Sequence, residues 1–170
     1  SSPTEGEIAI SFRAGISPFK KKLQTVKPGD TMYISQYGND YGFHLKDNRS
    51  SVLIAGGIGI APFRSMLKEM FDMRIKSEVQ LIYLNKNDNF LFKEELETWR
   101  HVLPNISIEY IETKDLNRKS REKLVLSLIK DTTHNFYIAG PEAMVENTEH
   151  LLMDNGVNIK NIRIDSFGTY

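Results

Sequence analysis

Residues 53–70 read LIAGGIGIAPFRSMLKEM, and this stretch decides the fold. An apolar run typical of a buried strand leads into three glycines within four positions, followed by Pro62 and an amphipathic helical pattern. Glycine loses more backbone freedom on folding than any other residue, so a cluster of glycines needs a structural or functional reason. The stretch predicts a strand, a tight glycine turn and a helix that begins near Pro62, where a proline costs no hydrogen bond.

The same alternation of strand and helix continues to the end of the chain. Short apolar runs predict buried strands at residues 51–55, 78–84, 106–112, 135–139 and 161–165. Helical patterns separate them at residues 63–71, 92–103, 120–130 and 142–156, the last closed by Gly156 as a C-terminal cap. Strands linked by helices form parallel sheets through right-handed crossovers. We therefore expect an α/β fold, a five-stranded doubly wound parallel sheet of order 3-2-1-4-5.

The first 47 residues have a different pattern. Residues 7–13 and 31–35 alternate apolar and polar side chains, which favours antiparallel strands, and a short helix is expected at residues 18–24. Two or three strands do not make a stable domain by themselves, so this segment is predicted to be part of a larger antiparallel β-barrel. The expected domains are thus residues 1–47, the C-terminal part of a barrel, and residues 48–170, the parallel-sheet domain.

Composition excludes several classes of function. Lysine and arginine total 22 and aspartate and glutamate total 22, so the charge balance favours neither a nucleic-acid nor a membrane-surface partner. The chain has no cysteine, which excludes disulfides, a thiolate nucleophile and iron–sulfur ligation by its own residues. The four histidines are too scattered to form a metal site or a catalytic triad. A soluble cytoplasmic protein without a bound metal is expected.

Two glycine loops are predicted to share one edge of the sheet. The first, at residues 56–59, follows the first parallel strand, and the second, Gly140-Pro141, follows the fourth. In the order 3-2-1-4-5 these strands are neighbours whose crossovers run to opposite faces, which makes the point between them a ligand site. A helix N-terminus there attracts phosphate. A tight turn without any ligand is the alternative reading.

These loops resemble those of the ferredoxin–NADP reductase superfamily of flavoenzymes. The resemblance rests on IAGGIGIAPFRSML, FYIAGPEAM and the aromatic ending DSFGTY, and it extends upstream to SSPTE, RAGISPFKKKL and the segment from KPGD to YGFHL. Three departures from the family pattern are visible. The family's Arg-x-Tyr-Ser flavin motif does not occur in the sequence, Ala139 replaces a common cysteine, and Thr169 replaces a glycine.

The resemblance implies hydride transfer between NADP or NAD and FAD, in which the cofactors carry the chemistry. It assigns Gly15, Ile16 and Ser17 to the FAD pyrophosphate, and it assigns to NAD(P) the residues Gly56, Gly57, Ile58, Gly59, Pro62, Ala139, Gly140 and Pro141. Asn85 and Lys86 occupy the place where the adenosine ribose is read, although the nearby Asp88 leaves the choice between NADH and NADPH open. Either Phe167 or Tyr170 is expected to stack on the flavin.

The expected activity is that of an NAD(P)H:acceptor oxidoreductase, a flavoprotein that passes electrons to ferredoxin, flavodoxin or another redox partner. Because the chain begins just beyond the position of the flavin motif, we expect it to bind NAD(P) but not FAD by itself and to be inactive alone. Two alternatives remain open at this point. The chain is either an electron-transfer subunit of a larger redox complex or a dinucleotide-binding module without redox chemistry.

Overall fold

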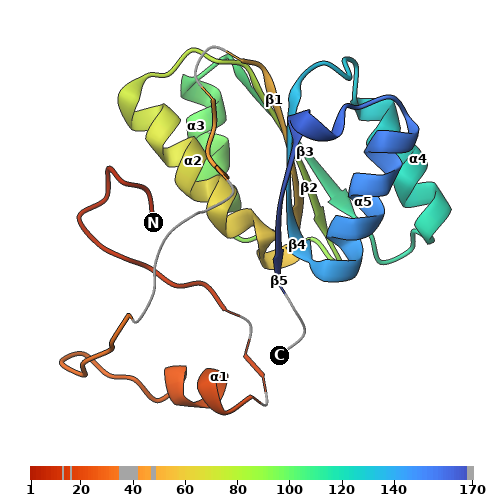
Figure 1. Ribbon diagram of the computed structural model, residues 1–170. Helices are drawn as coiled ribbons and strands as arrows, with labels where there is room; N and C mark the ends of the chain where they lie inside the picture. The colour runs from red at the N-terminus through yellow and green to blue at the C-terminus, as the bar shows by residue number, and fades with distance from the viewer. Residues whose placement is uncertain (13, 16, 35–41, 47–48, 168–170) are drawn as a thin grey trace.

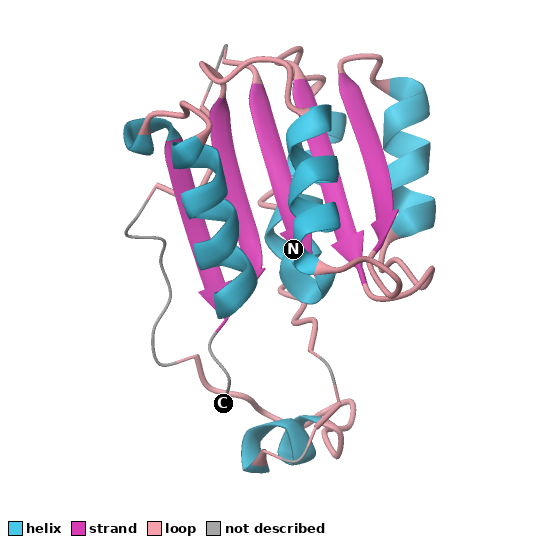
Figure 2. Ribbon diagram, turned by 90° about the vertical axis from the view of Figure 1, so that its right-hand side faces the viewer, coloured by secondary structure: helices cyan, strands magenta, loops and turns pink. Residues whose placement is uncertain are grey.

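The computed structural model describes residues 1–12, 14–15, 17–34, 42–46 and 49–167. Its main body has three layers, with a parallel sheet between two pairs of helices (Figures 1 and 2). The described residues among the first 50 lie along and beyond one side of this body (Figure 1). The layered body is the arrangement that the alternating sequence pattern predicts.

The sheet confirms the predicted topology. Five parallel strands run in the order β3-β2-β1-β4-β5. Their bounds are β1 Ser51–Gly56, β2 Val79–Asn85, β3 Ile106–Glu112, β4 Asn135–Pro141 and β5 Ile162–Phe167. Strands β1 and β4 are neighbours in space although two strands separate them in the sequence, so the sheet reverses its winding between them.

The helices cover both faces of the sheet. Figure 1 shows α2 (Ile60–Met73) and α3 (Lys93–Val102) on one face, with α4 (Arg118–Leu128) and α5 (Glu142–Asp154) on the other. Short 3-10 turns precede α2 and β5, at η1 (Gly57–Gly59) and η2 (Ile159–Asn161). Gly156 follows the C-cap of α5 with a φ of 88°, as expected for a glycine that ends a helix.

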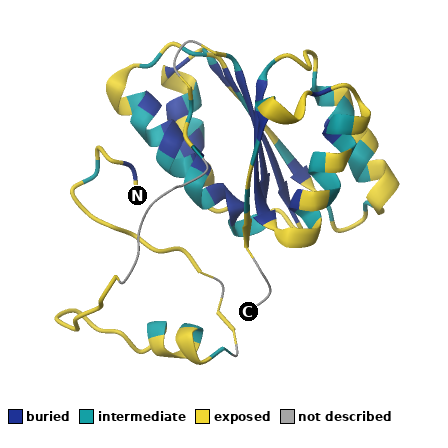
Figure 3. Cartoon of the chain, viewed as in Figure 1, coloured by how far each residue is buried: buried dark blue, intermediate teal, exposed yellow. Residues whose placement is uncertain are grey.

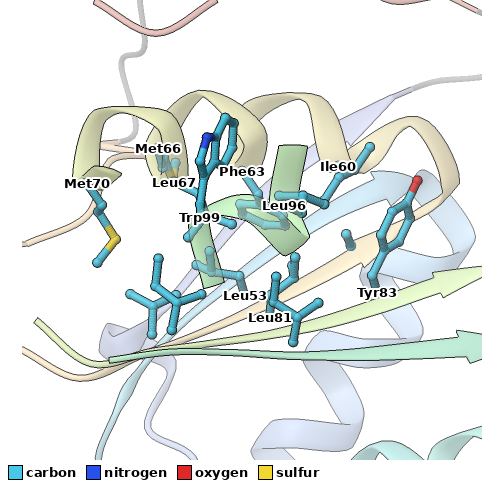
Figure 4. Close-up of a cluster of buried hydrophobic side chains, with 14 of the residues drawn as sticks. Leu53, Ile60, Phe63, Met66, Leu67, Met70, Leu81, Tyr83, Leu96 and Trp99 are labelled. Atoms are coloured by element: carbon cyan, nitrogen blue, oxygen red, sulfur yellow. The ribbon is translucent and has the colours of Figure 1, made fainter. Parts of the chain in front are cut away.

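The core consists of two apolar layers, one on each face of the sheet. Strand residues alternate between them, so that Leu53 packs beneath α2 and α3 whereas Ile54 packs beneath α4 and α5. Figure 4 shows the first layer, in which Phe63 and Leu67 of α2 descend onto the sheet. The sheet is the buried centre of the molecule in Figure 3, because helices exclude water from both of its faces.

The described residues of the N-terminal part include the helix α1 (Pro18–Leu23), near its predicted place. Ser17 caps this helix, and its Oγ accepts a hydrogen bond from the Lys20 N–H at 3.3 Å. The described residues within 7–12 and 31–34 are not strands, although their pattern favours that conformation. A strand needs a partner for its N–H and C=O groups, and side-chain pattern alone does not supply one. The partial β-barrel stays a prediction.

Residues just before the parallel sheet contribute to its core. The Phe43 ring stacks on the Phe63 ring of α2, with 5.7 Å between the ring centres. It meets the Tyr137 ring of β4 edge-on, with 5.6 Å between the centres. The Tyr137 hydroxyl donates a hydrogen bond to the His44 carbonyl at 2.7 Å. The division of the chain at residue 48 stays a prediction, yet residues 43 and 44 already pack on the main body.

The first five residues are clasped to the outer side of α2. Arg64 donates hydrogen bonds to both carboxylate oxygens of Glu5, at 2.7 and 2.6 Å, and it pairs with Glu95 of α3 at 2.5 Å. Its guanidinium also lies 5.5 Å from the centre of the Trp99 ring. Ser65 donates to the Ser1 carbonyl at 2.5 Å. These contacts fix the segment against the helix, and the two-carboxylate arrangement holds the arginine in one orientation.

This clasp predicts a pH-dependent N-terminal segment. Hydrogen bonds from Arg64 lower the pKa of Glu5, so the contact is present above the ordinary glutamate pKa and is lost as the pH falls through the lowered value. We expect hydrogen exchange in residues 1–12, corrected for the intrinsic rate at each pH, to become faster at acidic pH. An Arg64→Gln variant should exchange fast throughout. Protection that is independent of both pH and Arg64 would contradict the assignment.

Candidate functional site

The two glycine loops meet where β1 and β4 end. A Cβ atom placed on Gly140 would lie 3.1 Å from the carbonyl oxygen of Gly56 and 3.2 Å from its Cα, so the two backbones are in contact. Gly56 closes β1, and Gly140 is the penultimate residue of β4. The predicted meeting of the loops at the reversal point of the sheet is confirmed.

Gly57 and Gly59 each require a glycine, for different physical reasons. Gly57 adopts the left-handed conformation, with a φ of 56°. Gly59 instead has an ordinary helical φ of −59°, but a Cβ there would overlap the carbonyl group of Ala139 in β4 and lie 2.7 Å from the Gly140 nitrogen. Gly59 is therefore required by the packing of η1 and α2 against β4. Contact of these glycines with a ligand stays a prediction.

A cleft of about 300 Å³ opens beside the junction, at the carboxyl ends of the strands. Six of the residues predicted from the sequence line this cleft. They are Gly56, Gly57, Ile58, Asn85, Lys86 and Pro141. The remaining lining residues come from β2, the loop after β3, α4 and α5, and they are Leu84, Thr113, Arg121 and Met144. The first turn of a helix leaves N–H groups without partners inside the helix, and Ile58 lies in η1, the turn that leads directly into α2.

Asn85 organises one wall of the cleft. Its buried side-chain amide donates to the Asn89 carbonyl at 2.9 Å and to the Asn87 carbonyl at 3.1 Å, which folds the loop after β2. The backbone carbonyl of Asn85 accepts hydrogen bonds from the Thr113 N–H at 2.8 Å and from the Thr113 hydroxyl at 3.0 Å. Asn85 thus ties the loops after β2 and β3 together, and its predicted contact with the ribose stays a prediction.

The charged residues that line the cleft are both basic. Lys86 is exposed at the end of β2, and Arg121 lies partly buried on α4. None of the described residues that line the cleft carries a carboxylate, and Asp88 is not among them. Sequence reasoning identified Lys86 from its place after a strand. It missed Arg121, because only the packing of α4 brings this helix position to the same opening.

The far side of the junction contains Phe167. This residue ends β5, pairs in register with Pro141 and is 36% exposed. Two positions earlier in β5, Asp165 lies opposite Ala139, and burial raises the pKa of its carboxyl group. The Ala139 side chain itself belongs to the buried core on the α2 face. Tyr170, the other predicted aromatic partner of a flavin, lies outside the described residues.

The predicted FAD-side residues are not part of this cleft. Gly15 and Ser17 precede α1, which stands apart from the sheet in Figure 1, and Ile16 lies outside the described residues. Pro62 lies in the first turn of α2 and is not among the residues that line the cleft. Roles for all four in cofactor binding stay predictions.

The described part of the chain contains no group of three side chains suited to hold a metal ion. Among the helices of those same residues, none has the length and apolar character needed to cross a bilayer.

Comparison with known proteins identifies the family. The model of the oxidoreductase NAD-binding domain family matches residues 53–150, which include both glycine loops. The chain belongs to this family.

Several characterised proteins are similar over most of this chain. A Bacillus cereus flavohemoprotein is 29% identical over 84% of this chain and 39% of its own length. The gamma subunit of sulfhydrogenase 2 from Pyrococcus furiosus is 28% identical over 93% of this chain and 61% of its own length. The solved FAD/NAD-binding domain of a nitric oxide dioxygenase from Vibrio cholerae has a TM-score of 0.67 at 21% identity, covering 78% of this chain and 56% of that one. The chain thus spans only part of the length of each.

The packing of Gly59 yields a stability prediction. A Gly59→Val variant should be less stable by about 1–3 kcal/mol, because its side chain would displace β4 from the start of α2. Chemical denaturation measures this loss. Gly6→Ala is the matched control, since no atom lies within 4 Å of a Cβ at that position. Equal stability of Gly59→Val and the native chain would show that the close approach to β4 is not needed.

Proposed function

We propose that this chain binds NAD(P)H in the cleft beside the two glycine loops and forms the dinucleotide-binding part of an FAD-dependent oxidoreductase. The observation that carries the proposal is the meeting of both loops at the reversal point of the sheet, within a chain of the NAD-binding family. In open α/β sheets this is the place where a dinucleotide lies across the strand ends.

Each part of the cleft has a role in this proposal. The dinucleotide supplies a hydride when it is bound. Gly57 and Ile58 bring the backbone close to the pyrophosphate, and the helix N-terminus adds a favourable field. Asn85 and Lys86 face the adenosine half. Gly140 and Phe167, on the other side of the junction, orient the nicotinamide half and shield it from water.

The acceptor side of the reaction is proposed from the relatives. The solved Vibrio cholerae domain is described as binding both FAD and NAD, which supports FAD as the hydride acceptor of the whole protein. In this proposal Gly15, Ile16 and Ser17 approach the FAD pyrophosphate, and Phe167 or Tyr170 covers the flavin ring. Electrons then pass to a ferredoxin, a flavodoxin or another redox partner.

Similarity to a sulfhydrogenase gamma subunit favours one version of this function, in which the chain belongs to an electron-transfer subunit of a larger complex. Both versions use the same dinucleotide site, and they differ in where the electrons go. Purification of the native protein with its associated chains separates them, since only the subunit version predicts stable partners.

A charge placed at Gly57 tests the phosphate site. Asparagine and aspartate both tolerate the left-handed conformation of this position, and they have nearly the same size. We expect Gly57→Asp to bind NAD(P)⁺ more weakly than Gly57→Asn by at least about 1 kcal/mol, since only the aspartate repels the pyrophosphate. Isothermal titration calorimetry of the two variants measures the difference. Equal affinities would place the pyrophosphate elsewhere.

Flavin binding by the 170-residue chain is tested separately. The sequence lacks the Arg-x-Tyr-Ser motif that holds FAD in the resembling flavoenzymes. We expect the chain, after incubation with excess FAD and desalting, to retain little absorbance in the flavin band. It should also oxidise little NADH or NADPH with an artificial acceptor, while it still binds the dinucleotide. A stoichiometric yellow protein that turns over would contradict this expectation and would exclude a dinucleotide-sensing module.

A further inference from the structure

We propose that Arg121 and Lys86 together bind the 2′-phosphate of NADPH, so that the cleft selects NADPH over NADH. This inference rests on the proposed function and adds the choice of dinucleotide to it. Neither glycine loop distinguishes the two dinucleotides, because both carry the same pyrophosphate. Discrimination needs groups at the adenosine ribose, where NADPH has an additional phosphate.

Two cations from distant parts of the sequence line one opening. Lys86 follows β2, whereas Arg121 lies on α4, after β3. The acidic and basic residues of the whole chain cancel, 22 against 22, yet the described lining of this cleft includes two basic side chains and no acidic one. Both charged side chains that line this cleft are therefore cations, and Glu122, which lines the adjoining pocket with Arg121, is paired with Arg118.

Arg121 lacks the carboxylate partner that its neighbour has. One turn earlier on α4, Arg118 forms an ion pair with Glu122 at 2.6 Å. Arg121 forms no ion pair within the described part of the chain, although it is partly buried. Withdrawing a guanidinium from water without an anion is unfavourable. A ligand phosphate would supply the missing anion.

Hydrogen bonds join the two loops that lead to these cations. The Thr113 N–H and hydroxyl both donate to the Asn85 carbonyl, at 2.8 and 3.0 Å, and join the loop after β2 to the loop that leads into α4. Lys86 is the next residue after Asn85. The arginine offers a planar fork of donors and the lysine a mobile point charge, a combination suited to a phosphate dianion.

In the structure, Asp88 is a weaker argument against NADPH binding than it is in the sequence. In the sequence this carboxylate stands two residues from Lys86, where it would repel a phosphate. Asp88 is exposed and is not among the residues that line the cleft. Its charge therefore acts across solvent and is weakened by salt.

The test compares single substitutions in the full chain by calorimetry with four ligands: NADP⁺, NAD⁺, 2′-phospho-AMP and AMP. Arg121→Gln should weaken NADP⁺ and 2′-phospho-AMP by about 10- to 100-fold, the effect of one lost charge-assisted contact. Affinity for NAD⁺ and AMP should change by less than about 2-fold, since both lack the group that the arginine contacts. Lys86→Gln should show the same selectivity with a smaller loss, because a single point charge is lost.

Arg118→Gln is the matched control, since it removes the same charge from the same helix at a position paired with Glu122 and outside the cleft. It should leave the preference for NADP⁺ unchanged. Equal losses for NADP⁺ and NAD⁺ in Arg121→Gln would place the arginine at the pyrophosphate and overturn the inference. So would equal affinities of the native chain for both dinucleotides. A native chain that binds neither would refute the proposed function as well.

Discussion

The close approach of Gly59 to the backbone of β4 is the constraint on which the site depends. Because no side chain intervenes, the turn that opens α2 lies directly on Ala139 and Gly140. This contact brings the two glycine loops together across the boundary between β1 and β4. A side chain at residue 59 would separate the loops and reshape the cleft. Gly59 is needed first for the packing of α2 on β4, and this packing sets the shape of the cleft that a ligand would enter.

Hydrogen bonds around Asn85 hold the other wall of the cleft. Loops at the ends of parallel strands have few neighbours. The buried amide of Asn85 donates to two backbone carbonyls of the loop after β2, and these hydrogen bonds restrict that loop strongly. The Thr113 contacts extend this restriction to the loop before α4. The cleft is thus bounded by backbone contact on one side and by a side-chain network on the other, an arrangement that favours a preformed site.

The Arg64 clasp gives the N-terminal segment a defined relation to the sheet. Glu5 and Glu95 approach the same guanidinium from different elements, and Trp99 packs beside it. Helix α2 therefore contacts the N-terminal segment through Arg64 and Ser65, and it begins at the glycine turn beside the cleft.

The α/β class, the strand order and the meeting of the glycine loops could all be predicted from the amino-acid sequence. These follow from local patterns and from the fixed hand of strand crossovers, which leave few topologies for five buried strands. Three features became visible in the folded chain alone: Gly59 packs against β4, Asn85 braces two loops, and Arg121 lines the same cleft as Lys86. Each of these depends on which distant segments come together. The predicted strands at residues 7–13 and 31–35 show the same limit, because alternation describes the faces of a strand but a strand forms only with a partner for its backbone.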